Sequence, residues 1–268
     1  MRFQLIRAGW ILAICAQAVP LHAADGVQIV ERTTTAGVAR TTRIQIEPQR
    51  MRVETESTGP GQMIVFDGAK QVMWMIDPSR KSYSEMTKAD VDRMGSQVSG
   101  MMAEMQKQLE GMPPAQRAQI EALMKGRGAG MPGMPGAAAR TEYRRAGSDM
   151  VGKWACAKYE GFQSNQKVSE LCTVEPQALG FTAADFAVSR QVADFFRGMM
   201  PANADDIFRI GTPEEQGFSG VPVRRISFSA GQQRSVTELV EVSRQAFPDA
   251  LFSLPAGLQR QAMPGLGR

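Results

Sequence analysis

Histidine is almost absent from this 268-residue chain, which has a single copy, His22. His22 lies in an N-terminal stretch with the pattern of a cleaved export signal, so we expect the mature chain to have none. Without histidine, the Ser-His-Asp and Cys-His pairs of hydrolases and the usual zinc sites are excluded. No glycine-rich phosphate loop follows a predicted strand either. We therefore expect a protein that is not an enzyme and that has no cofactor.

Blocks of charge of one sign are missing too. The chain has 31 lysine and arginine residues and 27 aspartate and glutamate residues, and the two kinds are interspersed. A nucleic-acid-binding surface usually needs a concentrated stripe of basic residues, so no nucleic-acid partner is expected. The adjacent acids at Asp205-Asp206 and Glu214-Glu215 fall in predicted loops, where such pairs are usually hydrated.

The chain has no apolar run long enough for a permanent membrane span. Its N-terminal apolar run, Ala8–Val19, follows two arginines and precedes a small-residue site at Ala23, a combination typical of an export signal. Residues 1–23 are therefore predicted to be cleaved off, with cleavage after Ala24 as the alternative. We expect the mature protein to be exported to the periplasm as a soluble chain.

Cysteine is scarce as well. Removal of the signal takes Cys15 and leaves Cys156 and Cys172, on the arms KWACAKYEGF and KVSELCTV of a predicted β-hairpin. In an oxidising compartment, an even pair at this spacing is expected to form a disulfide. Such a bond would contribute roughly 3 kcal/mol of stability in the chain-entropy model. Two free buried thiols are the alternative.

The polar turn Gln163-Ser164-Asn165 predicts the register of this hairpin. Folding the chain about Ser164 sets Cys156 opposite Cys172. The same register gives an apolar pair and an opposite-charge pair: Trp154 with Val174 and Lys158 with Glu170. Cross-strand pairs of this kind stabilise a sheet, and Asn165 suits a left-handed position in a short loop.

Predicted strands alternate with turns on both sides of a central helical region. Before it they cover Val27–Glu56 and the hairpin Met63–Ile76, and after it Val221–Ala230 and Ser235–Val242. In the second strand of the hairpin both faces are apolar, so this part of the sheet is predicted to be covered on both sides. The apolar segment Phe247–Pro255 is expected to anchor the end of the chain.

A long amphipathic helix is predicted to begin where Thr87 and Asp90 resemble a capping box. Its apolar residues recur every three or four positions on one stripe: Val91, Met94, Val98, Met101, Met105, Leu109 and Met112. Pro113-Pro114 should end this helix and begin a shorter one, and the Gly/Met/Pro-rich stretch that follows is predicted to be a flexible linker. A further helix is predicted after a cap formed by Thr182 and Asp185.

These elements predict an α+β fold in which a mostly antiparallel sheet carries helices on one side. We expect a single domain over residues 24–258. Residues 88–139 form a Met-rich helical insertion in this prediction, and residues 259–268 form a flexible tail.

Three stretches are familiar as a set: Arg50–Met86, the hairpin WACAKYEG…SELCTVEP, and LFSLPAG at Leu251–Gly257. Together they resemble the domain-of-unknown-function family numbered 4412 (DUF4412), which consists of exported bacterial proteins. That family is similar to the lipoprotein carriers with a LolA-like fold. The resemblance implies a curved antiparallel half-barrel with helices over its concave face, in the cell envelope. It implies no catalytic residues.

A half-barrel lined by methionine and phenylalanine, with the stripe that begins at Val91 as its lid, would bind an apolar ligand. The expected partner is a lipid, an acylated protein or an apolar protein segment. The candidate ligand-binding residues are Met73, Met75, Met94, Val98, Met101, Met105, Phe195, Phe196 and Met199. For each of them the alternative is ordinary core packing, which apolar helical spacing usually indicates.

Two other functions stay open as alternatives. Eight of the 18 methionines lie between Met94 and Met134, and Met131 and Met134 are a candidate thioether pair for Cu(I). The lack of histidine and of free cysteine weakens this copper hypothesis. A structural or sensory envelope protein that binds another protein would use the same apolar residues as a lipid carrier.

Overall fold

The computed structural model describes residues 26–56, 61–114, 116, 141–199 and 217–263. Within them, twelve strands form one sheet in the order β12-β6-β5-β4-β3-β2-β1-β11-β10-β9-β8-β7. The strands before the central helix are β1 (Gly26–Thr35), β2 (Val38–Ile46), β3 (Arg50–Glu56), β4 (Gln62–Asp67), β5 (Val72–Asp77) and β6 (Ser82–Thr87). The later strands are β7 (Glu142–Val151), β8 (Trp154–Gln163), β9 (Gln166–Val174), β10 (Val221–Ser229), β11 (Gln232–Gln245) and β12 (Gln259–Arg260).

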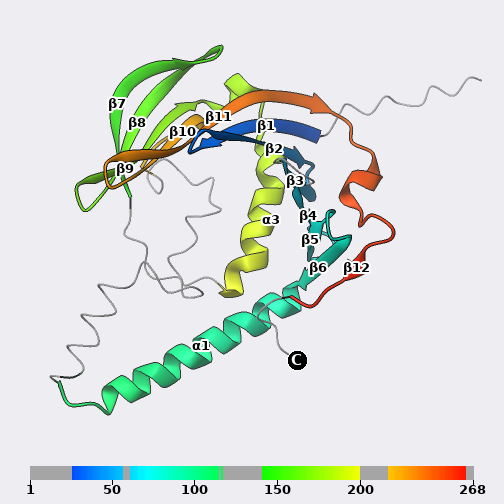
Figure 1. Cartoon of the computed structure of the whole chain (residues 1–268), viewed down its shortest axis with the longest axis vertical. Helices are drawn as coiled ribbons and strands as arrows, with labels where there is room; N and C mark the ends of the chain where they lie inside the picture. The colour runs from blue at the N-terminus through cyan, green and yellow to red at the C-terminus, as the bar shows by residue number, and fades with distance from the viewer. Residues whose placement is uncertain (1–25, 57–60, 115, 117–140, 200–216, 264–268) are drawn as a thin grey trace, which may run out of the picture.

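The sheet is curved and open, and its neighbouring strands are antiparallel except for β12 beside β6 (Figure 1). The predicted α+β class and the large curved antiparallel sheet are therefore confirmed. Helix α3 (Ala187–Phe196) lies inside the curve, and the segment after β11 lies outside it (Figure 1). We call the side that carries α3 the inner face and the opposite side the outer face.

Two-residue loops close three of the hairpins. They are Ala36-Gly37, Ser164-Asn165 and Ala230-Gly231, and all six residues have φ between 47° and 80°. Loops with two left-handed residues match the right-handed twist of the strands that they join. The left-handed conformation predicted for Asn165 is confirmed.

The disulfide Cys156–Cys172 is confirmed, with the two Cα atoms 5.4 Å apart, but the predicted register is wrong by two residues. Lys158 lies opposite Cys172. The loop has two residues instead of the predicted three, which shifts the register by one residue. A bulge beside Gly161 shifts it by one more. Because a shift of two preserves the faces, the cysteines still meet, and Lys158 Nζ still lies 3.0 Å from Glu170 Oε1.

Both faces of β4 and β5 are covered, as predicted. On the outer face, Phe252 of the C-terminal segment is 2% exposed and packs with Trp74 and its neighbours, so the predicted anchor is confirmed. On the inner face, Phe195 of α3 packs with Phe66 and Met73. A third cluster surrounds the disulfide.

The predicted tail at 259–268 begins with an ordered element. Gln259 and Arg260 form β12, which pairs with Ser82 and Tyr83 of β6. The amide of Gln259 donates to the carbonyl of Lys81 at 2.9 Å. This pairing covers polar backbone groups that β6 would otherwise present at the edge of the sheet.

Helix α1 (Lys88–Glu110) begins with the predicted capping box, in which Thr87 and Asp90 exchange hydrogen bonds. Val91 is fully buried, but Met101 is 64% exposed, and α1 extends away from the sheet (Figure 1). The expectation that the stripe beginning at Val91 forms the lid is therefore wrong, since α3 covers the inner face instead. Helical spacing shows that a helix has an apolar side and does not show what covers it. The predicted second helix and linker fall on residues 117–140, outside the described residues.

Candidate ligand-binding face

The segment that covers the inner face is held to β11 by one carboxylate, that of Asp185. Thr182 donates to Asp185 Oδ2 from its backbone amide at 2.6 Å and from its hydroxyl at 2.8 Å, which confirms the predicted cap. Arg244 of β11 donates to Asp185 Oδ1 at 3.3 Å and to the carbonyl of Gly180 at 2.8 Å. Burial raises the pKa of Asp185, but the hydrogen bonds from Thr182 and Arg244 outweigh it and hold that pKa below its usual value.

Inner-face residues form rows that run across the strands, because every second residue of a strand points to the same face. One such row lies beneath α3 and beneath the turns that precede α3. It consists of Val27, Ile46, Met51, Phe66 and Met73. Phe66 is fully buried, and its ring meets that of Phe195 edge-on with the centroids 5.4 Å apart. Val27 and Met73 are buried as well, whereas Ile46 and Met51 are half-buried and pack against this core.

The next row is also apolar but is only partly covered. It consists of Ile29, Ile44, Val53, Ile64 and Met75, on β1 to β5, and we call it the apolar row. Ile64 is 37% exposed and the other four are half-buried. At about 4.8 Å between strands, five strands give a row of about 19 Å. The row is thus a strip of accessible apolar surface beside α3.

Polar side chains take over one row further along the strands. Glu31, Thr42 and Thr55 are cross-strand neighbours there. Burial raises the pKa of Glu31 above its usual value, and the nearby Arg225 partly offsets the effect. Within the part of the chain that the structure describes, the Glu31 carboxylate has no hydrogen-bond or ion-pair partner. The inner face therefore changes from apolar to polar across one row.

The nine candidate ligand-binding residues are in different environments. Met75 belongs to the apolar row, whereas Met73 and Phe195 are core residues with 7% and 0% exposure. Half-buried positions are taken by Met94, Met105 and Phe196. Val98 and Met101 are exposed on α1, at 37% and 64%. Met199 ends a short turn after α3, and its side chain lies outside the described part of the structure.

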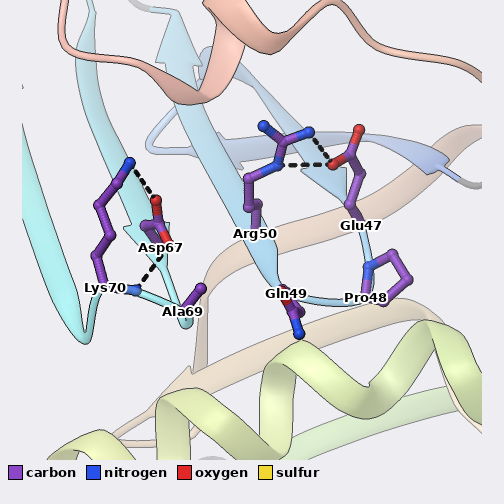
Figure 2. A pocket seen from close by; sticks show the side chains of 7 residues that line it. All are labelled: Glu47, Pro48, Gln49, Arg50, Asp67, Ala69 and Lys70. Carbon is purple, nitrogen blue, oxygen red and sulfur yellow. Dashed lines mark hydrogen bonds and ion pairs between the residues drawn. The ribbon is translucent and has the colours of Figure 1, made fainter.

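A hollow of about 520 Å³ opens beside the loops Glu47–Arg50 and Asp67–Lys70 (Figure 2). Its charges neutralise one another, because Arg50 pairs with Glu47 and Lys70 Nζ lies 2.8 Å from Asp67 Oδ2. A second hollow, of about 330 Å³, is lined by Gln166, Lys167, Phe228, Ala230 and Gly231. Lys167 there is paired with two glutamates.

The described ranges contain neither a metal site of the usual ligands nor a membrane-crossing helix. No three His, Cys, Asp or Glu side chains come together there as a metal site. Met131 and Met134, the candidate copper ligands, lie outside those ranges. Among the described helices, none combines the length and the apolar character that crossing a membrane requires.

No protein-family model matches the sequence, and a search of curated proteins finds no match. The resemblance to family 4412 thus stays a prediction. Among solved structures, an uncharacterised conserved protein from Thermus thermophilus is 11% identical, with a TM-score of 0.46 over 90% of this chain and 91% of that one. MucB of Pseudomonas aeruginosa, in its complex with MucA, is 12% identical, with a TM-score of 0.38 over 87% of this chain and 57% of that one.

A LolA superfamily protein from Nitrosomonas europaea is 10% identical, with a TM-score of 0.27 over 85% of this chain and 89% of that one. The match to MucB spans little more than half of that protein's length. Because all three TM-scores lie below 0.5, we base neither fold nor function on these similarities.

Sequence reasoning missed most of the apolar row. Strand periodicity alone identifies Ile44, Val53 and Met75 as apolar members of strands, but it does not show that they are neighbours. The signal lies in the pairing of β1 to β5, which is a set of successive hairpins. Aligning these hairpins from their turns would have placed the five residues in one row.

Proposed function

We propose that this protein is a non-catalytic binding protein of the cell envelope. In this proposal it acts in the periplasm, and its sheet serves as a half-barrel similar to that of lipoprotein carriers. It holds the apolar part of a lipid, an acylated protein or an apolar protein segment. The ligand lies on the inner face, in contact with the apolar row.

The observation that carries the proposal is the partial exposure of the apolar row. Ile44, Val53 and Met75 are half-buried and Ile64 is 37% exposed, whereas Val27, Phe66 and Met73 of the row beneath α3 are buried. Exposed apolar surface that is contiguous, rather than scattered, is a common feature of interaction sites. Methionine at one end of the row suits ligands of irregular shape.

The chemistry of the chain supports the compartment and the absence of catalysis. A disulfide such as Cys156–Cys172 persists in oxidising compartments, and the N-terminal pattern is that of an export signal. The single histidine of the sequence belongs to that signal. The described residues offer no base-and-nucleophile pair that could be assigned a reaction.

Titration of the protein with a fluorescent phosphatidylcholine tests the proposal. Ile64→Gln places an amide in the apolar row and is expected to weaken binding about tenfold, since burial of an isoleucine side chain is worth roughly 1.5–3 kcal/mol. Met101→Gln is the matched control on α1 and should leave the affinity unchanged. Loss of binding in Met101→Gln with no effect of Ile64→Gln would move the site from the sheet to α1.

A further inference from the structure

Three arginines occupy one transverse row of the inner face, two residues beyond the row of Glu31. The register runs from Arg40 through Thr33 and Thr237 to Arg225, and then through Leu171 and Tyr159 to Arg145. The hydroxyl oxygens of Thr33 and Thr237 lie 2.9 Å apart, so the side chains of this row meet on one face. We call Arg40, Arg225 and Arg145 the arginine row.

These guanidinium groups are exposed and uncompensated. Within the described ranges, none of the three has a hydrogen-bond or ion-pair partner. On the inner face of β1, β2 and β7 to β11, strand alternation places a single acid among the described residues, Glu31. Glu31 interacts electrostatically with Arg225.

Cations on the outer face are arranged differently. There, Arg43 pairs with Glu56 and Arg224 with Asp149. Lys158 lies 3.0 Å from Glu170 in the same way. The three cations of the arginine row, by contrast, lie unpaired among the described residues, on the face that also carries the apolar row.

The arginine row lies within reach of a molecule that is bound to the apolar row. Ile29 and Thr33 mark the two rows on β1, and four residues of strand separate them by about 13 Å. β2 carries Ile44 of the apolar row and Arg40 of the arginine row, so the two rows overlap there. A ligand on this face meets apolar surface at one end and positive charge at the other.

Resting on the function proposed above, we propose that the ligand is an anionic phospholipid. Its acyl chains lie along the apolar row, and its phosphate group is bound by Arg225 or by Arg40, the two members nearest to the apolar surface, which three strand spacings of about 4.8 Å separate. Arg145, three strands beyond Arg225, adds positive charge farther along the same face. Guanidinium groups bind phosphate through two parallel hydrogen bonds, which gives both strength and orientation. The lone carboxylate of Glu31 beside Arg225 moderates this attraction.

The test compares fluorescent phosphatidylglycerol with phosphatidylcholine that has the same acyl chains. The wild-type protein is expected to bind phosphatidylglycerol about tenfold more tightly, and added salt should reduce that preference. The triple variant Arg40→Gln, Arg145→Gln, Arg225→Gln should lose the preference while its affinity for phosphatidylcholine is retained. Glu31→Gln should strengthen the preference.

Arg32→Gln is the matched control, because Arg32 is an exposed arginine on the outer face of β1. It should leave the preference unchanged. Equal binding of the two lipids by the wild-type protein, or a preference that survives in the triple variant, would overturn the arginine-row proposal alone. Failure of both lipids to bind would overturn lipid binding in the proposed function, and the arginine-row proposal with it. Circular dichroism of the triple variant checks that it is folded.

Discussion

The hydroxyl oxygens of Thr33 and Thr237 lie 2.9 Å apart, although 204 positions separate the two residues in the sequence. They join β1 to β11, so the first described strand and the longest late strand are neighbours in the middle of the sheet. Every row of the inner face that crosses this junction depends on that long-range pairing. The proposed binding face is therefore assembled from both ends of the chain.

The disulfide is expected to stabilise the hairpin end of the sheet. Replacing both cysteines, Cys156→Ala with Cys172→Ala, should lower the free energy of unfolding by about 3 kcal/mol, because the unfolded chain loses a closed loop. Urea denaturation of the oxidised protein and of the double variant gives the difference. Reduction of the wild-type protein should reproduce most of it. A difference below about 1 kcal/mol would contradict a structural role for the bond.

Phe195 is expected to be the main anchor of α3 on the sheet. It is fully buried between Phe66 and Phe196, so Phe195→Ala should cost about 3–5 kcal/mol of unfolding free energy. Met101→Ala removes a side chain that is 64% exposed and should change stability by less than about 0.5 kcal/mol. Thermal or urea denaturation of the two variants compares them. Similar costs for both would show that α1 packs against the protein around Met101 as well as at Val91.

Asp185 gives the protein a specific weakness to acid. Its folded-state pKa is held below the unfolded value of about 3.9, so the unfolded state takes up the proton first as the pH falls. The stability that Asp185 contributes is therefore fully present above pH 5 and is lost as the pH falls through the folded pKa. Asp185→Asn should cost about 1–3 kcal/mol at pH 7 and flatten the decline of stability at acid pH.

The control for this prediction is Asp194→Asn. Asp194 lies on α3 and pairs with Arg197, but its side chain is 57% exposed. An exposed ion pair of this kind contributes less than about 1 kcal/mol. Denaturation at several pH values between 2 and 7 compares the two variants. If Asp194→Asn flattens the acid decline as much as Asp185→Asn does, the bond from Asp185 to Arg244 is not what holds α3 in place.

Much of the local structure could be predicted from the sequence. The cap at Thr87, the cap at Thr182 and the left-handed conformation of Asn165 are determined by residues within three or four positions of one another. The disulfide pair also follows from spacing within one hairpin. Local hydrogen bonding and backbone preference decide such features, so a short window of sequence contains the information.

The arrangement of the binding face could not be predicted in the same way. The bulge near Gly161 changes the hairpin register by one residue, and no residue type signals it from the sequence. The pairing of β1 with β11 depends on the whole sheet. The apolar stripe of α1 looks like that of any packed helix, yet Met101 is exposed. Tertiary contacts decide all three features, and the periodicity of apolar residues in the sequence gives no information about those contacts.

The most direct test of the inner face as a binding site is photo-crosslinking with a phosphatidylglycerol that carries a diazirine in its acyl chain. Irradiation of the complex, proteolysis and mass spectrometry locate the labelled residues. Labels on the peptides that contain Ile44, Val53, Ile64 and Met75 are predicted, with little label on 88–110. Labelling confined to 88–110, or none above the level of an unirradiated sample, would contradict the binding of a lipid by the sheet.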